Sequence, residues 1–257
     1  MIDRRRAFRT QRAEVLEFCA SLSPADWRMN SRATGWSVTD VVAHMGSGCH
    51  AMFSPAVFTL MRADSLERNN DQLVDDRRDR TPAQVLAEYR RWSRVFGQAT
   101  AAMTAPPLAG VQVRLAELGR FPMRLLPSAL VFDHYTHLRH DIAPALGRGA
   151  PAGDANRMAA VLEWMMAVLS SQIGAATPAW FDRTVVITLT GPGGGSWAVT
   201  GAGTVVGDSQ PGASRITAAA TEFPNWGTRR SRWRDHDVRI EGDVDYGAAF
   251  LDWVRVI

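Results

Sequence analysis

One predicted helix in the middle of the chain carries the residue types best suited to chemistry. Its apolar stripe begins at Met123 and continues, in steps of three and four residues, onto Asp133 and His137. The next position of the stripe is His140 or Asp141. Burying a carboxylate and an imidazole without partners costs on the order of several kcal/mol, and a divalent metal ion would satisfy both groups. The alternative is a stripe that emerges into solvent near the helix end, with Asp133 and His137 as an ordinary surface pair.

A further candidate, His44, belongs to a different predicted helix. On a helical wheel it lies at the flank of the apolar stripe, beside Gly48 and Ala51, which are small residues that leave room for a ligand. A single histidine in such a position is more often a satisfied structural residue than a metal ligand. From the residues alone, both interpretations of His44 stay open.

Long helices are the elements that would position these side chains. Ser37 followed by Asp40, and Thr81 followed by Gln84, are typical of helix N-termini. Apolar residues at three- and four-residue steps predict helices over residues 6–22, 38–60, 82–103, 122–146 and 156–173. Helices of this length, joined antiparallel, predict a bundle. The charged stretch 62–80 indicates an exposed connection or an irregular lid.

The pattern changes after Pro178. β-Branched residues at 183–190, a glycine-rich turn and a second run at 197–200 predict a hairpin. Residues 214–220 and 237–240 could add strands, and a closing helix follows. We therefore predict an α+β protein, with an up-down helical bundle over residues 1–176 and a small α/β domain over residues 182–257.

Composition argues against several classes of function. The 257-residue chain has a net charge of +3, and its arginines are spread along the sequence among 26 acidic residues, so we expect no nucleic-acid partner. No apolar run reaches the roughly 18 residues of a membrane span, and the first residues lack the apolar core of a secretory signal. We therefore expect no membrane partner and a cytoplasmic location. Cys19 and Cys49 lie in apolar helical patterns, which predicts reduced core residues.

Two segments lie near the predicted metal-bearing helices: residues 22–27, Leu-Ser-Pro-Ala-Asp-Trp, and residues 36–44, Trp-Ser-Val-Thr-Asp-Val-Val-Ala-His. They resemble the start of the mycothiol-dependent maleylpyruvate isomerase family, within the wider DinB-like bundles. In that family the tryptophan-led helix carries a metal-binding histidine. A later helix supplies a carboxylate and a second histidine at Glu-x-x-x-His spacing, followed by Asp-Ile or Asp-Leu and a glycine. Here residues 133–137 and 141–147 occupy those places.

The resemblance implies a metal site formed by His44, Asp133 and His137. Two histidines and a carboxylate with an open position suit a catalytic zinc, which is the first choice, although octahedral divalent ions would tolerate the same ligands. Asp133 stands where the family usually has glutamate, which shortens the carboxylate arm by one methylene. A metal could therefore be held differently, by His134 or His140, or be bound weakly.

The resemblance extends to the second half of the chain. Phe223, the Arg229-Arg230 pair and residues 241–243 before the final helix are similar to the family's sterol-carrier-like domain. Guanidinium groups match carboxylates in geometry, so Arg229 and Arg230 are candidate catalytic residues that would grip carboxylates of the thiol or the substrate. The other interpretation is that the pair is a solvated surface.

The family role implies an enzyme that uses mycothiol as its thiol cosubstrate. A metal-activated thiolate would attack an electrophilic small molecule, either in a cis/trans isomerisation of an enedioate or in a thiol S-transfer. The implied partners are a low-molecular-weight thiol and a small-molecule electrophile, and the chain would act as a monomer or homodimer. The alternative is a non-catalytic DinB-like protein that binds a metal or a lipid-like small molecule.

Overall fold

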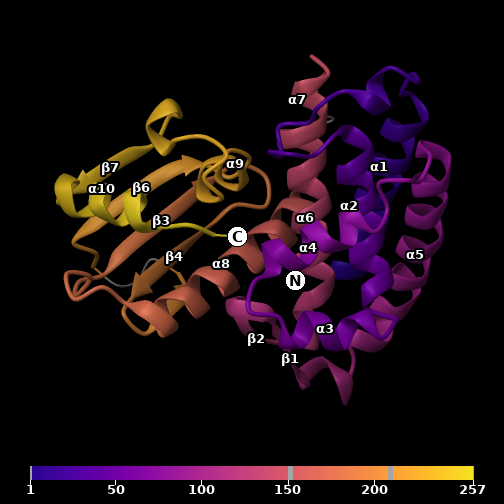
Figure 1. Cartoon of the computed structure of the whole chain (residues 1–257). Coiled ribbons are helices and arrows are strands. Elements are labelled where there is room, and N and C mark those ends of the chain that lie inside the picture. The colour runs from indigo at the N-terminus through magenta and orange to yellow at the C-terminus, as the bar shows by residue number, and fades with distance from the viewer. Residues whose placement is uncertain (1, 150–152, 208–210, 257) are drawn as a thin grey trace. The chain divides into compact units, whose positions relative to one another are not determined.

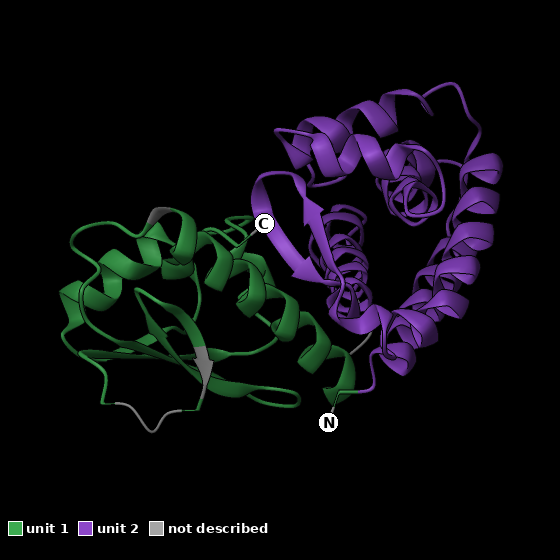
Figure 2. Cartoon of the chain, turned by 90° about the horizontal axis from the view of Figure 1, so that it is seen from below, with its two compact units in different colours: residues 1–2, 153–257 green, residues 3–152 purple. Residues whose placement is uncertain are grey.

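The computed structural model describes residues 2–149, 153–207 and 211–256. Contacts within the chain divide it into two compact units, one of residues 3–152 and the other of residues 153–257 with residues 1–2 (Figure 2). Over the described residues, the first unit is helical apart from one hairpin, and the second combines a sheet with helices. The predicted α+β class is confirmed.

The N-terminal unit is a helical bundle in which α1 and α2 each pack on both α5 and α6 (Figure 1). A short antiparallel hairpin lies between α5 and α6, and a π-helical turn joins α6 to α7. The elements are α1 (Arg4–Ala20), α2 (Val38–Ala51), α3 (Ala56–Arg62), α4 (Leu66–Asp75), α5 (Pro82–Met103), β1 (Gln112–Leu115), β2 (Gly119–Pro122), α6 (Leu126–Thr136), the π-helical turn (His137–Ile142) and α7 (Ala143–Ala145).

Both predicted helix caps form. The Ser37 hydroxyl accepts a hydrogen bond from the Asp40 backbone N–H, and the Asp40 carboxylate accepts one from the Ser37 backbone N–H. Thr81 and Gln84 close a second capping box at the start of α5. A cap of this kind stabilises its helix by about 1 kcal/mol. Because Ser37 determines where α2 begins, it also determines the position of His44 about two turns along that helix.

The apolar core of the bundle lies where α2 faces α1 and α5. Val41, Val42, Met45 and Tyr89 are fully buried there. The two helices approach closely at Gly46, where an added Cβ would lie 3.2 Å from the Tyr89 backbone. Any larger residue would therefore push α2 away from α5. Both cysteines are buried free thiols in this unit, as predicted.

Three details differ from the sequence interpretation. The stretch 62–80 contains α4, which Ser65 caps and the buried Val74 anchors, so it is not an irregular connection. The helix predicted over residues 38–60 ends at Ala51, and α3 begins after Pro55, because proline cannot donate the hydrogen bond that would continue a helix. No predicted element covers the β1–β2 hairpin, whose four-residue strands are too short to show a periodic pattern.

The C-terminal unit is a five-stranded sheet with helices. Its strand order is β5-β4-β3-β6-β7, in which β3 and β6 are parallel and every other pair is antiparallel. The predicted hairpin is the β3–β4 pair. The elements are α8 (Ala155–Ala176), β3 (Val185–Thr190), β4 (Gly195–Thr200), β5 (Gly203–Val206), β6 (Ser214–Ala219), α9 (Phe223–Gly227), β7 (Arg239–Gly242) and α10 (Val244–Trp253).

Helix α8 groups with this sheet, whereas the sequence pattern placed it in the bundle and the boundary at 176–182. The Thr204 backbone N–H and hydroxyl donate to the Ser170 hydroxyl and the Met166 carbonyl, both at 3.2 Å. A Cβ added at Gly193 would collide with the Ala155 carbonyl oxygen, so the β3–β4 turn lies directly against the start of α8. The helix is apolar enough to resemble a membrane span by composition, but more than half of it is buried inside the structure. Periodicity reveals an apolar face and not the surface that covers it.

A fragment of residues 153–257 should therefore fold on its own, whereas a fragment of residues 182–257 should not. Without α8, the apolar face of the sheet loses its cover and becomes accessible to dye. Circular dichroism during heating should show a cooperative transition for the longer fragment only, and the shorter one should bind an apolar fluorescent dye. Equal cooperativity of the two fragments would contradict the assignment of α8 to this unit.

Candidate metal centre

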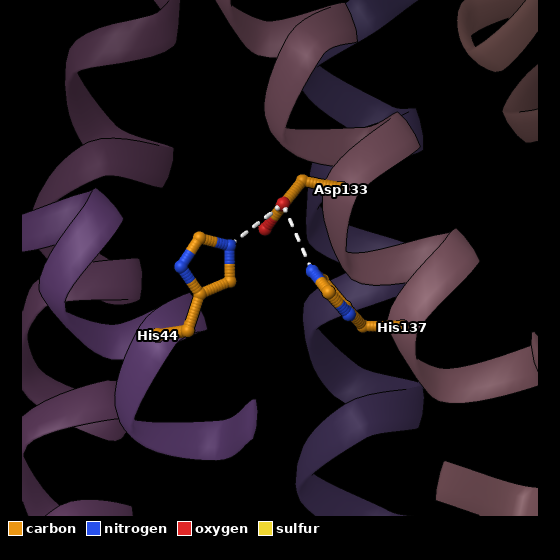
Figure 3. Close-up of side chains that lie close together, drawn as sticks. All are labelled: His44, Asp133 and His137. Atoms are coloured by element: carbon orange, nitrogen blue, oxygen red, sulfur yellow. Dashed lines mark hydrogen bonds and ion pairs between the residues drawn. The ribbon is translucent and has the colours of Figure 1, made fainter. Parts of the chain in front are cut away.

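Three side chains from two segments of the bundle meet inside the N-terminal unit. His44 lies on α2, Asp133 on α6, and His137 at the first position of the π-helical turn (Figure 3). His44 Nε2 lies 3.0 Å from Asp133 Oδ1, and His137 Nε2 lies 3.5 Å from the same oxygen. All three potential ligand atoms lie within 4.8 Å of one another. The fold thus brings together the three residues that the sequence pointed to.

The cluster is closed on the side of the histidines and more open at the carboxylate. His44 and His137 are 6% and 8% exposed, and the Asp133 side chain is 25% exposed. Trp36 covers the imidazoles, with its ring centroid 5.0 Å from that of His44 and 6.1 Å from that of His137. Trp36 Nε1 donates a hydrogen bond to Asp71 Oδ1 at 3.2 Å. Because Asp71 belongs to α4, that helix holds the Trp36 ring in place over the imidazoles.

The charges of the cluster shift one another's ionisation. Burial acts to raise the pKa of Asp133, but the imidazoles of His44 and His137 outweigh it and hold that pKa well below its usual 3.8. Burial acts to lower the pKa of His137, yet Asp133 and Asp141 raise it to about 9. Without a metal ion, the imidazole of His137 is therefore protonated on both nitrogens at neutral pH, and the resulting cation forms an ion pair with Asp133.

The donor atoms fit a divalent metal ion. Two imidazole nitrogens and a carboxylate oxygen are a ligand set typical of zinc. Around a tetrahedral ion with bonds of about 2.0–2.2 Å, ligand atoms lie about 3.3 Å apart. The separations of 3.0 Å and 3.5 Å between the imidazole nitrogens and Asp133 Oδ1 agree with this spacing. Octahedral divalent ions would use the same atoms together with water.

A second carboxylate lies behind His137. His137 Nδ1 is 2.7 Å from Asp141 Oδ2, and Asp141 is 1% exposed. An ionised carboxylate only accepts hydrogen bonds, so Nδ1 carries the hydrogen and Nε2 faces Asp133. The sequence left His140 or Asp141 as the next position of the polar stripe, and Asp141 is the one that contacts the cluster.

His134 lies beside the cluster, with Nε2 3.9 Å from Asp133 Oδ2, which is outside hydrogen-bond range. Its ring is fully buried, with Nε2 3.9 Å from Cys49 Sγ and Nδ1 3.4 Å from the Tyr89 hydroxyl. Burial lowers the pKa of His134 to about 4, so the ring is neutral. Within the described part of the chain, the group of converging ligand atoms contains neither His134 nor His140.

Arg229 and Arg230 belong to the C-terminal unit. Arg229 has a positive φ of 60°, and its guanidinium donates to the backbone carbonyls of Asp252 and Val254 at 2.7 Å and 3.2 Å. Arg229 therefore holds the end of α10 in place. Arg230 Nη1 donates to the Thr228 hydroxyl at 3.0 Å. A role of either arginine on a substrate stays a prediction.

Two residues that shape the site were not predicted as part of it. Trp36 entered the sequence interpretation only as the first residue of a motif, although a tryptophan directly before a helix cap is a usable signal for a residue that covers the first turns. Asp71 has no such signal, because it is one of several acidic residues in the polar stretch 62–80.

A helical bundle that holds two histidines and a carboxylate, followed by an α/β unit, defines the protein as a DinB-like bundle with a candidate divalent-metal site. The family model of the mycothiol maleylpyruvate isomerase N-terminal domain matches residues 8–143, more than half of the chain. The protein therefore belongs to this family. No curated protein matches its sequence.

Solved structures share the fold across both units. The chain aligns with crystal structures of the mycothiol-dependent maleylpyruvate isomerase and of a histidine-to-alanine variant, with TM-scores of 0.54 and 0.53. Each alignment covers 93% of this chain and 92% of the other at 14% identity. Sterol carrier protein 2 like 2 from Aedes aegypti aligns with 38% of this chain and 98% of its own, with a TM-score of 0.34 and 14% identity, which is too low to define the C-terminal unit.

The ion pair of His137 predicts a pH-dependent stability of the metal-free protein. The pKa of His137 rises from 6.5 in the unfolded chain to about 9, so its contribution is complete below pH 6.5 and is lost as the pH rises through about 9. In urea unfolding after chelation, His137→Gln should destabilise the protein at pH 6 by about 3 kcal/mol more than at pH 10.

His134→Gln is the matched control, because the pKa of His134, about 4, keeps that ring neutral over the whole range. Because the same ring titrates near 6.5 in the unfolded chain, the destabilisation by His134→Gln should be slightly smaller at pH 6 than at pH 10, by about 1 kcal/mol, opposite in sign to that of His137→Gln. A His137→Gln effect that is no larger at pH 6 than at pH 10 would show that this imidazole is not charged in the folded protein.

Proposed function

We propose that this protein is a mycothiol-dependent enzyme in which a divalent ion, zinc as first choice, is held by His44, Asp133 and His137. The observation that carries the proposal is the convergence of two imidazole nitrogens on one oxygen of Asp133, in a chain that belongs to the mycothiol maleylpyruvate isomerase family. When bound, the ion would supply a positive charge that lowers the pKa of a coordinated thiol and favours the thiolate.

The protein's own residues would prepare the site for this chemistry. Asp133 places negative charge where the cation binds, and its partial exposure leaves that side open to a small molecule. His44 and His137 direct their Nε2 atoms to the same point from opposite helices (Figure 3). Trp36 keeps water away from the imidazoles on the closed side, and Asp71 holds the Trp36 ring by its indole N–H.

Two reaction types use a thiol in this way. Addition of the sulfur to a cis-enedioate, rotation about the resulting single bond and elimination would give the trans isomer with the thiol returned. Attack of the same sulfur on an epoxide carbon with opening of the ring, or on a carbon that loses a halide ion, would give S-transfer. We propose the isomerisation first, because solved structures with this fold carry that name. The partners are then a low-molecular-weight thiol and a small electrophile. We also propose a cytoplasmic location.

Arg229 and Arg230 are proposed to bind carboxylates of the thiol or the substrate. The guanidinium of Arg229 donates to backbone carbonyls at the end of α10, and Arg230 Nη1 donates to the Thr228 hydroxyl. Substitution of Arg229 should act mainly through the stability of the C-terminal unit.

Metal content tests the ligand set. Elemental mass spectrometry of the purified protein should find about one divalent ion per chain, and His44→Ala and His137→Ala should each remove it, because two remaining donors bind a divalent ion much more weakly. His50→Ala is the matched control. It lies on the same helix, pairs with Glu88 at 3.1 Å and is not part of the cluster, so it should keep the metal.

The proposed ligands are wrong if both histidine variants retain the metal content of the wild type. A wild type that stays metal-free after incubation with zinc, cobalt or manganese would remove metal-dependent chemistry from the proposal altogether.

Activity tests the thiol requirement. The metal-loaded protein should isomerise maleylpyruvate only when mycothiol is added. The change in ultraviolet absorbance of the substrate measures the reaction. His44→Ala should lower kcat/KM at least 100-fold, and Arg230→Ala should raise KM for a dicarboxylate substrate while kcat changes little. Metal binding without turnover of maleylpyruvate or of other electrophiles would instead indicate a non-catalytic binding protein.

A further inference from the structure

Asp141 is the most deeply buried carboxylate near the site, and its side chain contacts the ring of a proposed metal ligand. It is 1% exposed, and its Oδ2 lies 2.7 Å from His137 Nδ1. We propose that Asp141 is a positioning residue that keeps the hydrogen of His137 on Nδ1 and aims the Nε2 lone pair at the point shared with His44 and Asp133. This inference rests on the proposed metal-dependent function.

The helix geometry around Asp141 supports this role. Residues 137–142 form a π-helical turn, in which the Ala143 N–H donates to the Leu138 carbonyl five residues earlier. Pro144 follows and has no N–H, so the carbonyl of residue 140 lacks its usual α-helical donor. Single π-helical turns are a local irregularity that occurs frequently at functional sites. Here the turn begins at His137 and contains Asp141.

A backbone contact fixes Asp141 independently of its side chain. The Asp141 carbonyl accepts a hydrogen bond from the Arg32 N–H at 3.0 Å. Arg32 belongs to the loop that leads to Trp36, whose ring covers both imidazoles. The backbone of Asp141 is thus held by the helix on one side and by this loop on the other, which fixes the point from which its carboxylate reaches His137. Because its backbone is fixed in this way, Asp141 can keep the His137 ring in one orientation.

The consequence for metal binding follows from the position of the hydrogen. With Nδ1–H committed to Asp141, the Nε2 lone pair of neutral His137 points toward Asp133 Oδ1 at 3.5 Å. Two electron-rich atoms facing each other require a proton or a metal ion between them, so once Nε2 loses its proton this point favours a metal ion. In metal sites, a carboxylate that accepts from the ring N–H of a ligand raises affinity roughly 10- to 100-fold.

His44 offers an internal contrast. Its Nδ1 is buried and has no hydrogen-bond partner among the described residues, so no carboxylate orients this ring as Asp141 orients His137. The effect of Asp141 should therefore be specific to His137.

The test compares zinc affinity, by competition with a chromophoric chelator, in the wild type, Asp141→Ala, Asp141→Asn and Glu88→Gln. Asp141→Ala should weaken zinc binding roughly 10- to 100-fold. Asp141→Asn, whose amide oxygen can still accept from Nδ1, should recover part of the loss. Glu88→Gln is the matched control, because Glu88 is a similarly buried carboxylate, 8% exposed, that pairs with Arg77 outside the site. It should leave zinc affinity unchanged.

A second readout does not depend on metal binding. Proton NMR of histidine labelled with ¹⁵N should show a slowly exchanging, downfield Nδ1–H signal of His137 in the metal-free wild type. The signal should vanish in Asp141→Ala and persist in Glu88→Gln. If Asp141→Ala does not fold, both measurements are made on Asp141→Asn, for which we expect a smaller loss of zinc affinity.

The outcomes separate the two proposals. A wild type that binds zinc, with Asp141→Ala within twofold of it, would overturn the positioning role and leave the proposed function intact. A wild type that binds no zinc would end the proposed metal function, and the Nδ1–H signal would then decide whether Asp141 orients the ring. Absence of that signal in the wild type would overturn the inference.

Discussion

The negative charge of Asp133, held between two imidazoles inside a helical bundle, is the constraint on which the rest of the N-terminal unit depends. A carboxylate in such a place is tolerated only beside positive charge and hydrogen-bond donors, and His44 and His137 supply both. Either a proton or a metal ion can provide the positive charge. In both cases the distance between α2 and α6 and the rotation of each helix about its axis must stay fixed. A small shift would leave the carboxylate without a partner.

That requirement accounts for contacts that packing of apolar faces would not need. Arg139, inside the π-helical turn, pairs with Glu14 of α1 at 2.8 Å, and both side chains are buried. Arg32 holds the same turn from the loop before α2. Asp71 of α4 fixes the Trp36 ring from the outside. Polar groups from three segments, α1, the loop before α2 and α4, thus hold a turn and a ring that a bundle core could not orient by itself.

Much of the local structure could be predicted because its causes are local. Ser37 and Thr81 predicted the starts of α2 and α5, since a cap depends on residues within one turn. The grouping of α8 with the sheet could not be predicted, because a periodic apolar face is the same whether helices or strands cover it. The helix α4 could not be predicted either, because it has almost no apolar face. Its single buried anchor, Val74, is too little to produce a stripe.

The sequence by itself determined that Asp133 and His137, followed by His140 or Asp141, share one side of a helix, because steps of three and four residues return to the same face. It also determined that these residue types can bind a metal or hold a proton. Only the tertiary structure decided that His44 joins them, across a separation of 89 positions from Asp133. The physical reason is that backbone hydrogen bonds relate neighbours along a helix, whereas the meeting of distant helices depends on how their apolar faces are buried together.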